Sequence, residues 1–527
     1  MKKLKENNQK LMIGNNNSLL ILFFLIGIGL LIRLYHIPFQ VPISVDGIDY
    51  FTYAIAINKE GYFPEGYISL NFGWSTFLSF IFSLSGSNEM MELMNIQRIF
   101  SSLISVFTAI PIYFICKTFF KNNIAILGAA LFLFTHHVIE NSILGITDPL
   151  FVFLVTVAIM FVFVKETKLF YLSFVFAALA GFTRYEGFLL IFPLLITFFI
   201  RKDFQKKSIL RTSLGVILFI SIMILINMTA YEQSNVEMLS PIFGGAGYVS
   251  NVVISNNTDP NNPFFTVNTE NQFQEFAYNS IITYTKYLGW IMIPVLGFFI
   301  IPGLFLTRKK LTKNKMIFLS FIVFLSISSL YAYGRGIQET RYLYPLIPIL
   351  ILFSCQFFDF LDRKSNIKKI MIVTVFTIII LSILFLEYEK PDYEYEEEIS
   401  DATVYAVNVA KGINTYDGSK FVRPAAVENS WPELPQKDER GKITANIKKI
   451  SSKNFENIEQ FIEENKSELS HLVIVKEEKQ LMLKDVFDNE KKYDYLEKIY
   501  DSQELGFQNQ IKIFKINFDI FNSKSEK

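Results

Sequence analysis

The chain has 527 residues, of which 51% are hydrophobic and 55 are phenylalanine, and its mean hydropathy is positive. This composition excludes an ordinary soluble globular protein and indicates a protein that crosses a membrane several times. The formal net charge of +1 argues against a nucleic-acid-binding protein. The two cysteines, Cys116 and Cys355, lie in apolar runs and indicate neither a disulfide framework nor a reactive thiolate.

Apolar runs of membrane-spanning length recur between Leu19 and Leu386 and then stop. Because about 20 apolar residues cross the hydrocarbon core of a bilayer, these runs predict about eleven transmembrane helices. The basic residues 1–10 precede the first run and no small-residue cleavage site follows it, which predicts a retained anchor. The predicted spans are 18–37, 96–116, 123–139, 148–164, 169–183, 186–200, 212–230, 285–306, 315–333, 341–358 and 369–386.

The composition divides the chain into two predicted domains. Residues 1–386 form a polytopic α-helical membrane domain with outer loops at 38–95 and 231–285, and residues 387–527 form a small soluble α/β domain. Within the first loop, the apolar stretch 72–84 predicts an interfacial helix. In the soluble domain, helical patterns at 454–465 and 481–487 alternate with strand patterns at 469–475 and 511–518.

Basic residues favour one side of the membrane. Connections rich in Lys and Arg alternate with connections nearly free of them, and the loop 231–285 contains none. By the positive-inside rule this predicts a cytoplasmic N-terminus, and an odd number of spans then places the C-terminal domain outside the plasma membrane. The acidic run 394–398 agrees with that side. The basic connections are 2–10, 117–121, 165–168, 201–211, 308–315 and 363–369.

The outer loop 231–285 is rich in Asn, Gly and aromatic residues. A loop of this length inside a compact domain is usually functional or mobile. We expect a cover over a substrate that includes short helices, and a disordered cover is the alternative.

Two carboxylates, Asp46 and Asp49, follow the first span, with Tyr50 directly behind them. An acid near the bilayer surface costs desolvation free energy unless water or a bound group compensates it. Capping of the following helix explains one such acid and explains two less well. We therefore predict that at least one of them acts as a general base on an attacking hydroxyl. Asp148, followed by Pro149, indicates a helix start first and an acceptor- or water-orienting role second.

Histidines form a second polar group on the same predicted face. His136 and Glu140 are spaced i, i+4, so they could share a divalent metal with an acid from a loop. Two ligands on one helix do not make a site. Polar lining of a cavity, together with His137, is therefore the preferred interpretation.

Arg184, Arg335 and Arg341 also fall on this face, which is otherwise poor in basic residues. Snorkelling to the interface explains one isolated arginine. Three of them indicate an anionic ligand, because the guanidinium fork matches phosphate oxygens and stays charged in apolar surroundings. The chain has no Gly-rich phosphate loop, zinc-protease helix motif or nucleophile elbow.

These residues resemble the GT-C superfamily of polytopic glycosyltransferases, in particular the branch of protein O-mannosyltransferases and the aminoarabinose transferase of lipid A. The likeness covers the membrane part and leaves out the C-terminal domain. In that family a second acid usually follows the first directly, whereas Gly47 follows Asp46 here. The motifs that carry the likeness are Asp46 with Asp49-Tyr50, Thr147-Asp148-Pro149-Leu150, Leu179-Ala180-Gly181-Phe182-Thr183-Arg184-Tyr185-Glu186-Gly187 and Arg341-Tyr342-Leu343-Tyr344-Pro345-Leu346-Ile347-Pro348.

The resemblance implies an inverting transfer of a sugar from a polyprenyl (dolichyl or undecaprenyl) phosphate to an acceptor hydroxyl on a protein, lipid or glycan. Asp46 would be the base, and Arg184 and Arg341, with Arg335 nearby, would stabilise the departing phosphate. No nucleotide site is needed. The residues expected to line the cavity are Tyr50, His136, His137, Glu140, Tyr185, Glu186 and Tyr342.

Two rival functions are considered beside the transferase, a secondary membrane transporter and a non-enzymatic membrane anchor. The chain has no Trp-Trp-Asp triplet, which argues against the related oligosaccharyltransferases. A secondary membrane transporter would place its ionisable residues near the midplane and often show repeated halves, whereas the charges here fall at helix ends. A non-enzymatic anchor for the C-terminal domain would need far fewer helices.

Overall fold

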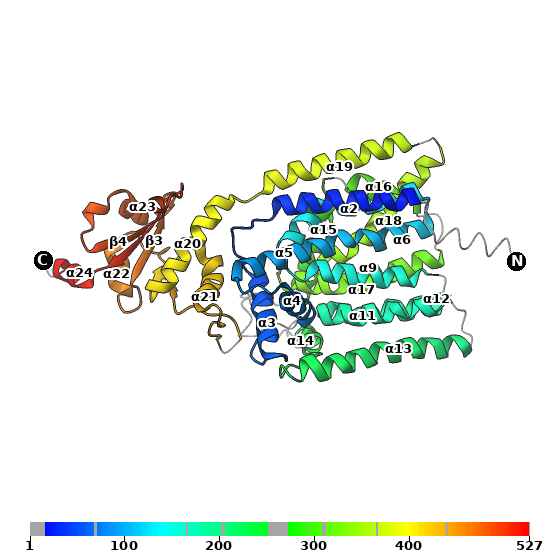
Figure 1. The fold of residues 1–527 in the computed structure, drawn as a ribbon, viewed down its shortest axis with the longest axis horizontal. Coiled ribbons are helices and arrows are strands. Elements are labelled where there is room, and N and C mark those ends of the chain that lie inside the picture. Colours follow the sequence, from blue (N-terminus) through cyan, green and yellow to red (C-terminus); the bar gives the residue numbers. More distant parts are fainter. Residues whose placement is uncertain are drawn as a thin grey trace.

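The protein, seen in a computed structural model, is a bundle of helices with a small sheet beyond one of its ends (Figure 1). The basic residues 1–10 and part of the Asn-rich outer loop, 251–271, lie outside the described residues. The structure describes residues 16–67, 71–164, 167–201, 206–250, 272–294, 296–307, 312–364, 367–438 and 441–525.

The apolar runs of the sequence form helices, but the predicted number of about eleven crossings is not confirmed. Among the described residues, six helical segments are long and apolar enough to cross a membrane, and two bent pairs raise the number to eight. One pair is α7 (Asn122–Leu133) with α8 (His136–Ile143), bent by 51°. The other is α15 (Gln272–Ile291) with α16 (Leu296–Thr307).

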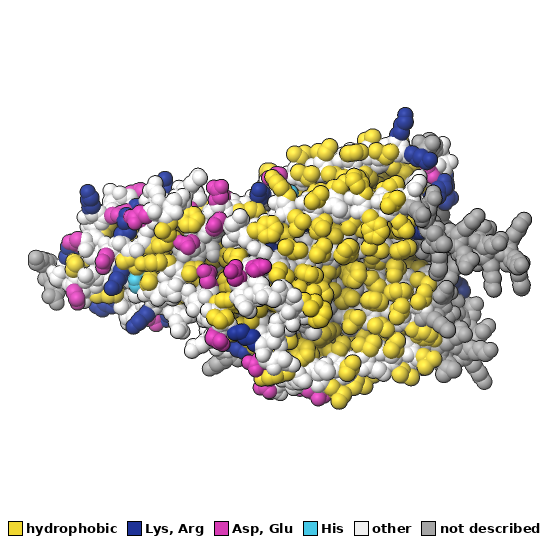
Figure 2. Space-filling model, in the orientation of Figure 1, with side chains coloured by type: hydrophobic (Ala, Val, Ile, Leu, Met, Phe, Trp, Pro, Cys, Tyr) yellow, Lys and Arg dark blue, Asp and Glu magenta, His cyan; other side chains and the backbone are white. Residues whose placement is uncertain are grey.

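The remaining elements of the bundle are continuous helices and short turns. Figure 2 shows apolar side chains covering the bundle between two ends that carry charge, as expected for a surface in contact with lipid. The elements are α2 (Asn16–His36), α3 (Asp46–Glu60), α4 (Phe72–Ser85), α5 (Met90–Phe107), α6 (Ala109–Phe119), α9 (Asp148–Val162), α10 (Thr167–Phe170), α11 (Leu172–Thr183), η1 (Tyr185–Leu190), α12 (Ile191–Arg201), α13 (Lys206–Ile226), η2 (Asn227–Tyr231), α14 (Ser240–Tyr248), α17 (Lys313–Gly334), η4 (Thr340–Leu346), α18 (Ile347–Asp362) and α19 (Lys368–Glu389).

The loop 38–95, predicted to be the first outer loop, contains α3, and the helix predicted at 72–84 is confirmed as α4. It packs on α3 and α11, and a Cβ on Gly73 would lie 2.8 Å from the Thr183 Cα atom, so the two backbones touch. The other outer loop contains the short helix α14, within the described part of that loop. Both loops lie at the end of the bundle that faces the sheet (Figure 1).

A tight turn separates α11 from η1, at the boundary between two predicted spans. A Cβ on Gly187 would come within 2.3 Å of the Ala180 carbonyl carbon, so only glycine fits this contact. Arg184, between the two elements, has extended backbone and its amide donates to the Ala180 carbonyl at 2.8 Å. The turn thereby fixes the residue that carries the guanidinium.

The C-terminal part contains a five-stranded mixed sheet of order β2-β1-β3-β5-β4. β3 pairs in parallel with β1 and antiparallel with β5, in a register that sets His471 opposite Lys515. The helices and strands predicted in this part are confirmed. The elements are α20 (Tyr393–Val409), β1 (Gly412–Asn414), η5 (Asp417–Phe421), α21 (Val422–Ser430), β2 (Lys448–Ile450), α22 (Ile458–Asn465), β3 (His471–Val475), α23 (Leu481–Asp488), η6 (Glu490–Lys492), β4 (Leu496–Asp501), η7 (Ser502–Leu505), β5 (Ile511–Ile516) and α24 (Phe518–Ser525).

The C-terminal part and the first outer loop share a hydrophobic core. Ala426 and Val427 of α21 belong to one buried cluster with Ile48 and Phe51 of α3. Apolar burial contributes roughly 25 cal/mol per Å², so this cluster holds α21 against the start of α3. The contact places side chains of the C-terminal part next to Asp46.

Candidate functional site

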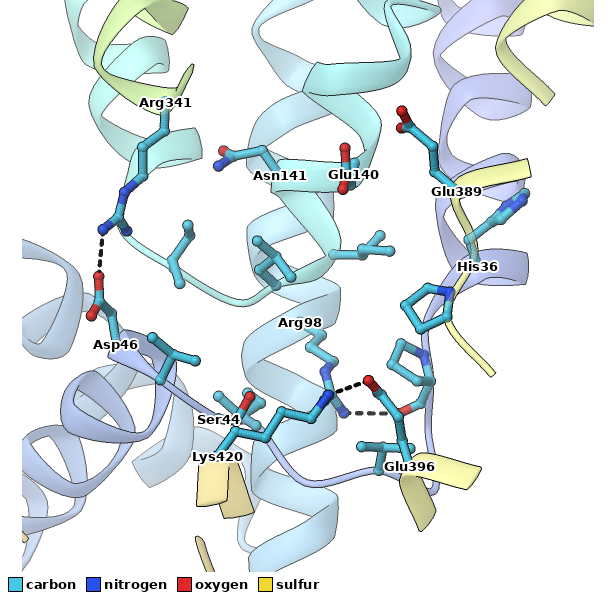
Figure 3. A pocket seen from close by; sticks show the side chains of 18 of the residues that line it. His36, Ser44, Asp46, Arg98, Glu140, Asn141, Arg341, Glu389, Glu396 and Lys420 are labelled. Atoms are coloured by element: carbon cyan, nitrogen blue, oxygen red, sulfur yellow. Dashed lines mark hydrogen bonds and ion pairs between the residues drawn. The ribbon is translucent and has the colours of Figure 1, made fainter. Parts of the chain in front are cut away.

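A cavity of about 570 Å³ lies at the end of the bundle that faces the sheet (Figure 3). Asp46 of α3, Arg341 of η4 and Glu140 of α8 line it, and η5 of the C-terminal part contributes Lys420. Arg341 Nη2 lies 2.7 Å from Asp46 Oδ2, and Arg341 Nε also donates to the carboxylate of Glu339. An acid and a guanidinium therefore face the same space.

The backbone that carries Asp46 is held in an unusual conformation. Val45, directly before it, has φ 53° and ψ −126°, which costs a β-branched residue about 1–3 kcal/mol. The Gly47 amide donates to the Ser44 carbonyl at 3.1 Å, and the Gln97 side chain donates to the Gly47 carbonyl at 3.1 Å. No side-chain hydrogen bond caps α3 at this start, so capping does not account for the acids.

Asp49 pairs with the C-terminal part. Both of its carboxylate oxygens accept from Arg423 Nη1 of α21, at 2.6 and 2.7 Å, and Arg423 Nη2 donates to the Val45 carbonyl at 2.9 Å. Burial raises the pKa of Asp49, and the charge of Arg423 opposes that rise. The two first-loop acids thus have different cationic partners.

A buried trio of charges lies between α9 and η1. Arg184 Nη1 donates to Asp148 Oδ1 at 2.7 Å, and its other nitrogens donate to the two oxygens of Glu186 at 2.8 and 3.3 Å. The rings of Phe151 and Tyr342 lie 5.7 and 5.4 Å from the guanidinium carbon. Relative exposure is 7% for Arg184, 2% for Asp148 and 4% for Glu186, so these charges compensate one another away from water.

Arg335 lies at the end of α17 among aromatic rings. Its guanidinium carbon is 4.9 Å from the centre of the Tyr248 ring and 5.7 Å from that of Tyr331, whose hydroxyl it contacts at 3.3 Å. Tyr248 belongs to α14, so the described part of the second outer loop reaches this arginine.

The rings of His136 and His137 are in contact, with centroids 3.7 Å apart and planes tilted by 41°. His136 Nε2 is 3.9 Å from Glu389 Oε2, and His137 Nε2 is 3.1 Å from the Trp290 carbonyl oxygen. Among the residues that the structure describes, no three His, Cys, Asp or Glu side chains gather as a metal site would need. His136 and Glu140 therefore gain no third ligand there.

The structure thus separates the predicted site residues into groups. Asp46, Arg341 and Glu140 share the cavity. The buried trio consists of Arg184, Asp148 and Glu186, with the Tyr342 ring over the guanidinium. The charges of Arg341 and Asp148 interact, which links the two groups. Tyr50 is buried in α3 and Tyr185 is half-buried in η1.

Three charged residues near Asp46 were not predicted. Glu339 stands close to Arg341 in the sequence, so its proximity could have been inferred. Lys420 and Arg423 belong to the C-terminal part, where no motif singles them out. Only the docking of α21 on α3 brings these two cations to the site.

The geometry can be compared with known proteins. Residues 73–230 match the dolichyl-phosphate-mannose-protein mannosyltransferase family. ArnT from Cupriavidus metallidurans, solved bound to undecaprenyl phosphate, superposes with a TM-score of 0.54 at 9% identity, over 94% of this chain and 97% of that one. This chain has the GT-C glycosyltransferase fold. The resemblance inferred from the motifs is thereby confirmed.

A second GT-C structure matches over much of its length. It is the oligosaccharyltransferase of Archaeoglobus fulgidus tethered to an acceptor peptide with an NVT sequon, with a TM-score of 0.50 and 11% identity, over 90% of this chain and 71% of that one. No curated protein sequence matches significantly. At 9–11% identity the likeness establishes the fold only, so the activity has to be argued from the residues of the site.

Proposed function

We propose that this GT-C chain is an inverting glycosyltransferase that moves a sugar from a polyprenyl-phosphate donor of the dolichyl type to an acceptor hydroxyl. The observation that carries the proposal is the pairing of Asp46 with Arg341 on the wall of one cavity of about 570 Å³. A cavity of this size suits a sugar phosphate. The match of residues 73–230 to a dolichyl-phosphate-mannose-dependent family supports the same donor class.

Asp46 is the general base in this proposal. Its carboxylate accepts the proton of the acceptor hydroxyl while that oxygen attacks the anomeric carbon from the face opposite the phosphate. The bond between the anomeric carbon and the phosphate oxygen breaks, and the lipid phosphate leaves with the electron pair. A single displacement inverts the anomeric configuration, so one base suffices, unlike the carboxylate pair of a glycosidase.

Arg341 is the cation that we assign to the leaving phosphate. Its guanidinium now contacts Asp46 and Glu339, and phosphate oxygens entering the cavity would compete with Asp46 for it. That exchange frees the carboxylate to take a proton while the guanidinium stabilises the charge that develops on the phosphate. Arg184 is already paired with two carboxylates. We therefore propose that it stabilises the surroundings of the site and does not contact the donor directly.

Membrane placement follows from the same proposal. The six long segments, the two bent pairs and three of the four shorter apolar helices would make eleven crossings. With the N-terminus in the cytoplasm, the soluble domain 387–527 and the cavity beside it would then face the outside of the plasma membrane. The membrane domain would be 1–386.

Both structural relatives bear on the substrates. ArnT was solved with undecaprenyl phosphate, and the Archaeoglobus enzyme was solved with an acceptor peptide. The donor proposed here has the same lipid-phosphate chemistry as the first ligand. The acceptor is a hydroxyl on a protein, lipid or glycan.

The test is sugar transfer by the purified full chain in proteoliposomes. Labelled dolichyl-phosphate mannose, and its glucose and aminoarabinose counterparts, are supplied with membrane extract as the acceptor source, and release of free lipid phosphate is measured. Asp46→Asn should abolish release. Asp362→Asn is the control. It breaks the 2.6 Å ion pair between Lys121 and Asp362, neither of which lines the cavity, and should leave the release of lipid phosphate unchanged. Solute flux without transfer would instead support a secondary transporter and refute the proposal.

A further inference from the structure

We infer that Arg423 of the C-terminal part is a positioning residue that holds Asp46 in place, so that the two parts build one active site. The inference rests on the proposed function of Asp46 as the base. Arg423 does not itself line the cavity. It acts through Val45, which does line the cavity and to whose carbonyl it donates, and through Asp49.

Arg423 forms hydrogen bonds with the chain on both sides of Asp46. One terminal nitrogen contacts both carboxylate oxygens of Asp49, at 2.6 and 2.7 Å, and the other donates to the Val45 carbonyl at 2.9 Å. A planar guanidinium can make these contacts together because its donors form a rigid fork. Asp46 lies between these two bonded positions, together with Gly47 and Ile48.

These hydrogen bonds matter because the backbone at Val45 is strained. Val45 has φ 53°, a conformation that a β-branched residue leaves unless its surroundings hold it. The bond from Arg423 to the Val45 carbonyl acts on the peptide unit that joins Val45 to Asp46. Releasing it allows this peptide to turn, which would move the Asp46 carboxylate away from Arg341.

Arg423 is not what attaches the C-terminal part to α3. Ala426 and Val427 pack against the buried core of the first loop, and the Trp431 ring stacks on Phe51 with centroids 6.0 Å apart. The Trp431 indole nitrogen also donates to the Asn88 carbonyl at 2.7 Å. Removal of the guanidinium should therefore leave the two parts docked, which makes its positioning role separable from folding.

The test compares Arg423→Ala and Arg423→Lys with a control at the same interface. Lys59→Ala removes a contact from the last turn of α3 to the Pro432 carbonyl and the 3.7 Å ion pair with Glu433, without touching the Asp46 segment. Hydrogen exchange of the amides of residues 44–49 is measured for each protein. Turnover is measured with dolichyl-phosphate mannose, or with whichever counterpart the unaltered chain accepts.

Arg423→Ala should lower kcat by about 10- to 100-fold, since an error of about 1 Å in a reacting group has this effect. KM for the donor should change little, because Arg341, which we assign to the donor phosphate, is not replaced. Exchange at residues 44–49 should rise. For Arg423→Lys, kcat and exchange should lie between those of the unaltered chain and those of Arg423→Ala, because an ammonium group cannot bind both partners as the guanidinium fork does. Lys59→Ala should match the unaltered chain in all three measurements.

The outcomes separate this inference from the proposed function. If the unaltered chain transfers sugar and Arg423→Ala keeps its kcat, the positioning role is refuted while the transferase proposal stands. If Arg423→Ala lowers kcat but leaves exchange at residues 44–49 unchanged, the inference also fails. If no donor is turned over, the proposed function fails, and exchange alone still decides whether Arg423 holds the segment.

Discussion

Arg184→Ala is expected to destabilise the membrane part strongly. The guanidinium lies between Asp148 and Glu186, with bonds of 2.7, 2.8 and 3.3 Å, and none of the three residues exceeds 7% exposure. Removing it leaves the two buried carboxylates without the cation that bonds to both of them. Breaking a buried ion pair by deleting one partner costs about 3–5 kcal/mol, and the second carboxylate places this site at the upper end of that range.

A matched variant separates charge balance from bulk. In Arg184→Met combined with Asp148→Asn and Glu186→Gln, no charge remains buried, and replacement of a whole buried ion pair is often neutral or stabilising. The triple variant should therefore recover most of the lost stability. An exposed pair is the second control: Arg363→Ala breaks a 2.6 Å contact with Asp359 but, with the Arg363 side chain 73% exposed, should cost about 0–1 kcal/mol.

Thermal unfolding in detergent, followed by tryptophan fluorescence and by the monodisperse fraction after heating, measures these differences. Arg184→Ala should lose its folded fraction at a clearly lower temperature than Arg363→Ala, and the triple variant should lie near the unaltered chain. An Arg184→Ala protein as stable as Arg363→Ala would refute the reasoning, because it would mean that the trio is hydrated or open. Full sugar transfer by the triple variant would remove Arg184 from the function altogether.

Four further substitutions test the site. Asp46→Asn should lower kcat by about 10²–10⁴-fold in the transfer assay, the range for loss of a general base. Asp49→Asn should reduce kcat far less and accelerate exchange at the start of α3, since it loosens Arg423 only. Arg341→Lys keeps the charge but loses the fork, so its loss of kcat should stay below the roughly 10²-fold effect of deleting a donor. Gly187→Ala should destabilise the fold by at least about 1–3 kcal/mol in thermal unfolding, since its Cβ would lie 2.3 Å from backbone.

The sequence predicted helices well because lipid imposes a simple rule on it. Backbone groups in hydrocarbon must be satisfied within a helix, so each apolar run becomes helical, as α2 and α19 illustrate. The number of crossings is harder to predict. The run 123–139 is broken at Thr135 into two helices bent by 51°, and the bend depends on packing that no hydropathy pattern records.

Some residues of the candidate site could likewise be predicted from the sequence, and others could not. The sequence predicted that Asp46 and Arg341 lie on the same face of the membrane, near the ends of predicted spans. In the structure they form an ion pair of 2.7 Å. The partners of Arg184 were visible in the sequence, but Asp148 was interpreted as a helix start with a secondary orienting role and Glu186 as a residue lining the cavity. Arg423 could not be found, since it is an ordinary arginine in a domain without motifs, and only tertiary packing brings it to Asp49.

The two first-loop acids illustrate why spacing alone left the choice of base open. Residues spaced i, i+3 lie on neighbouring faces of a helix, so sequence could not say which of Asp46 and Asp49 meets the substrate. Their partners distinguish them. The guanidinium of Arg341 belongs to the bundle and lines the cavity, whereas that of Arg423 belongs to the C-terminal part and grips the backbone. In the proposed reaction Asp46 therefore takes the proton and Asp49 helps to hold it in place through Arg423, so the C-terminal part would be necessary for activity.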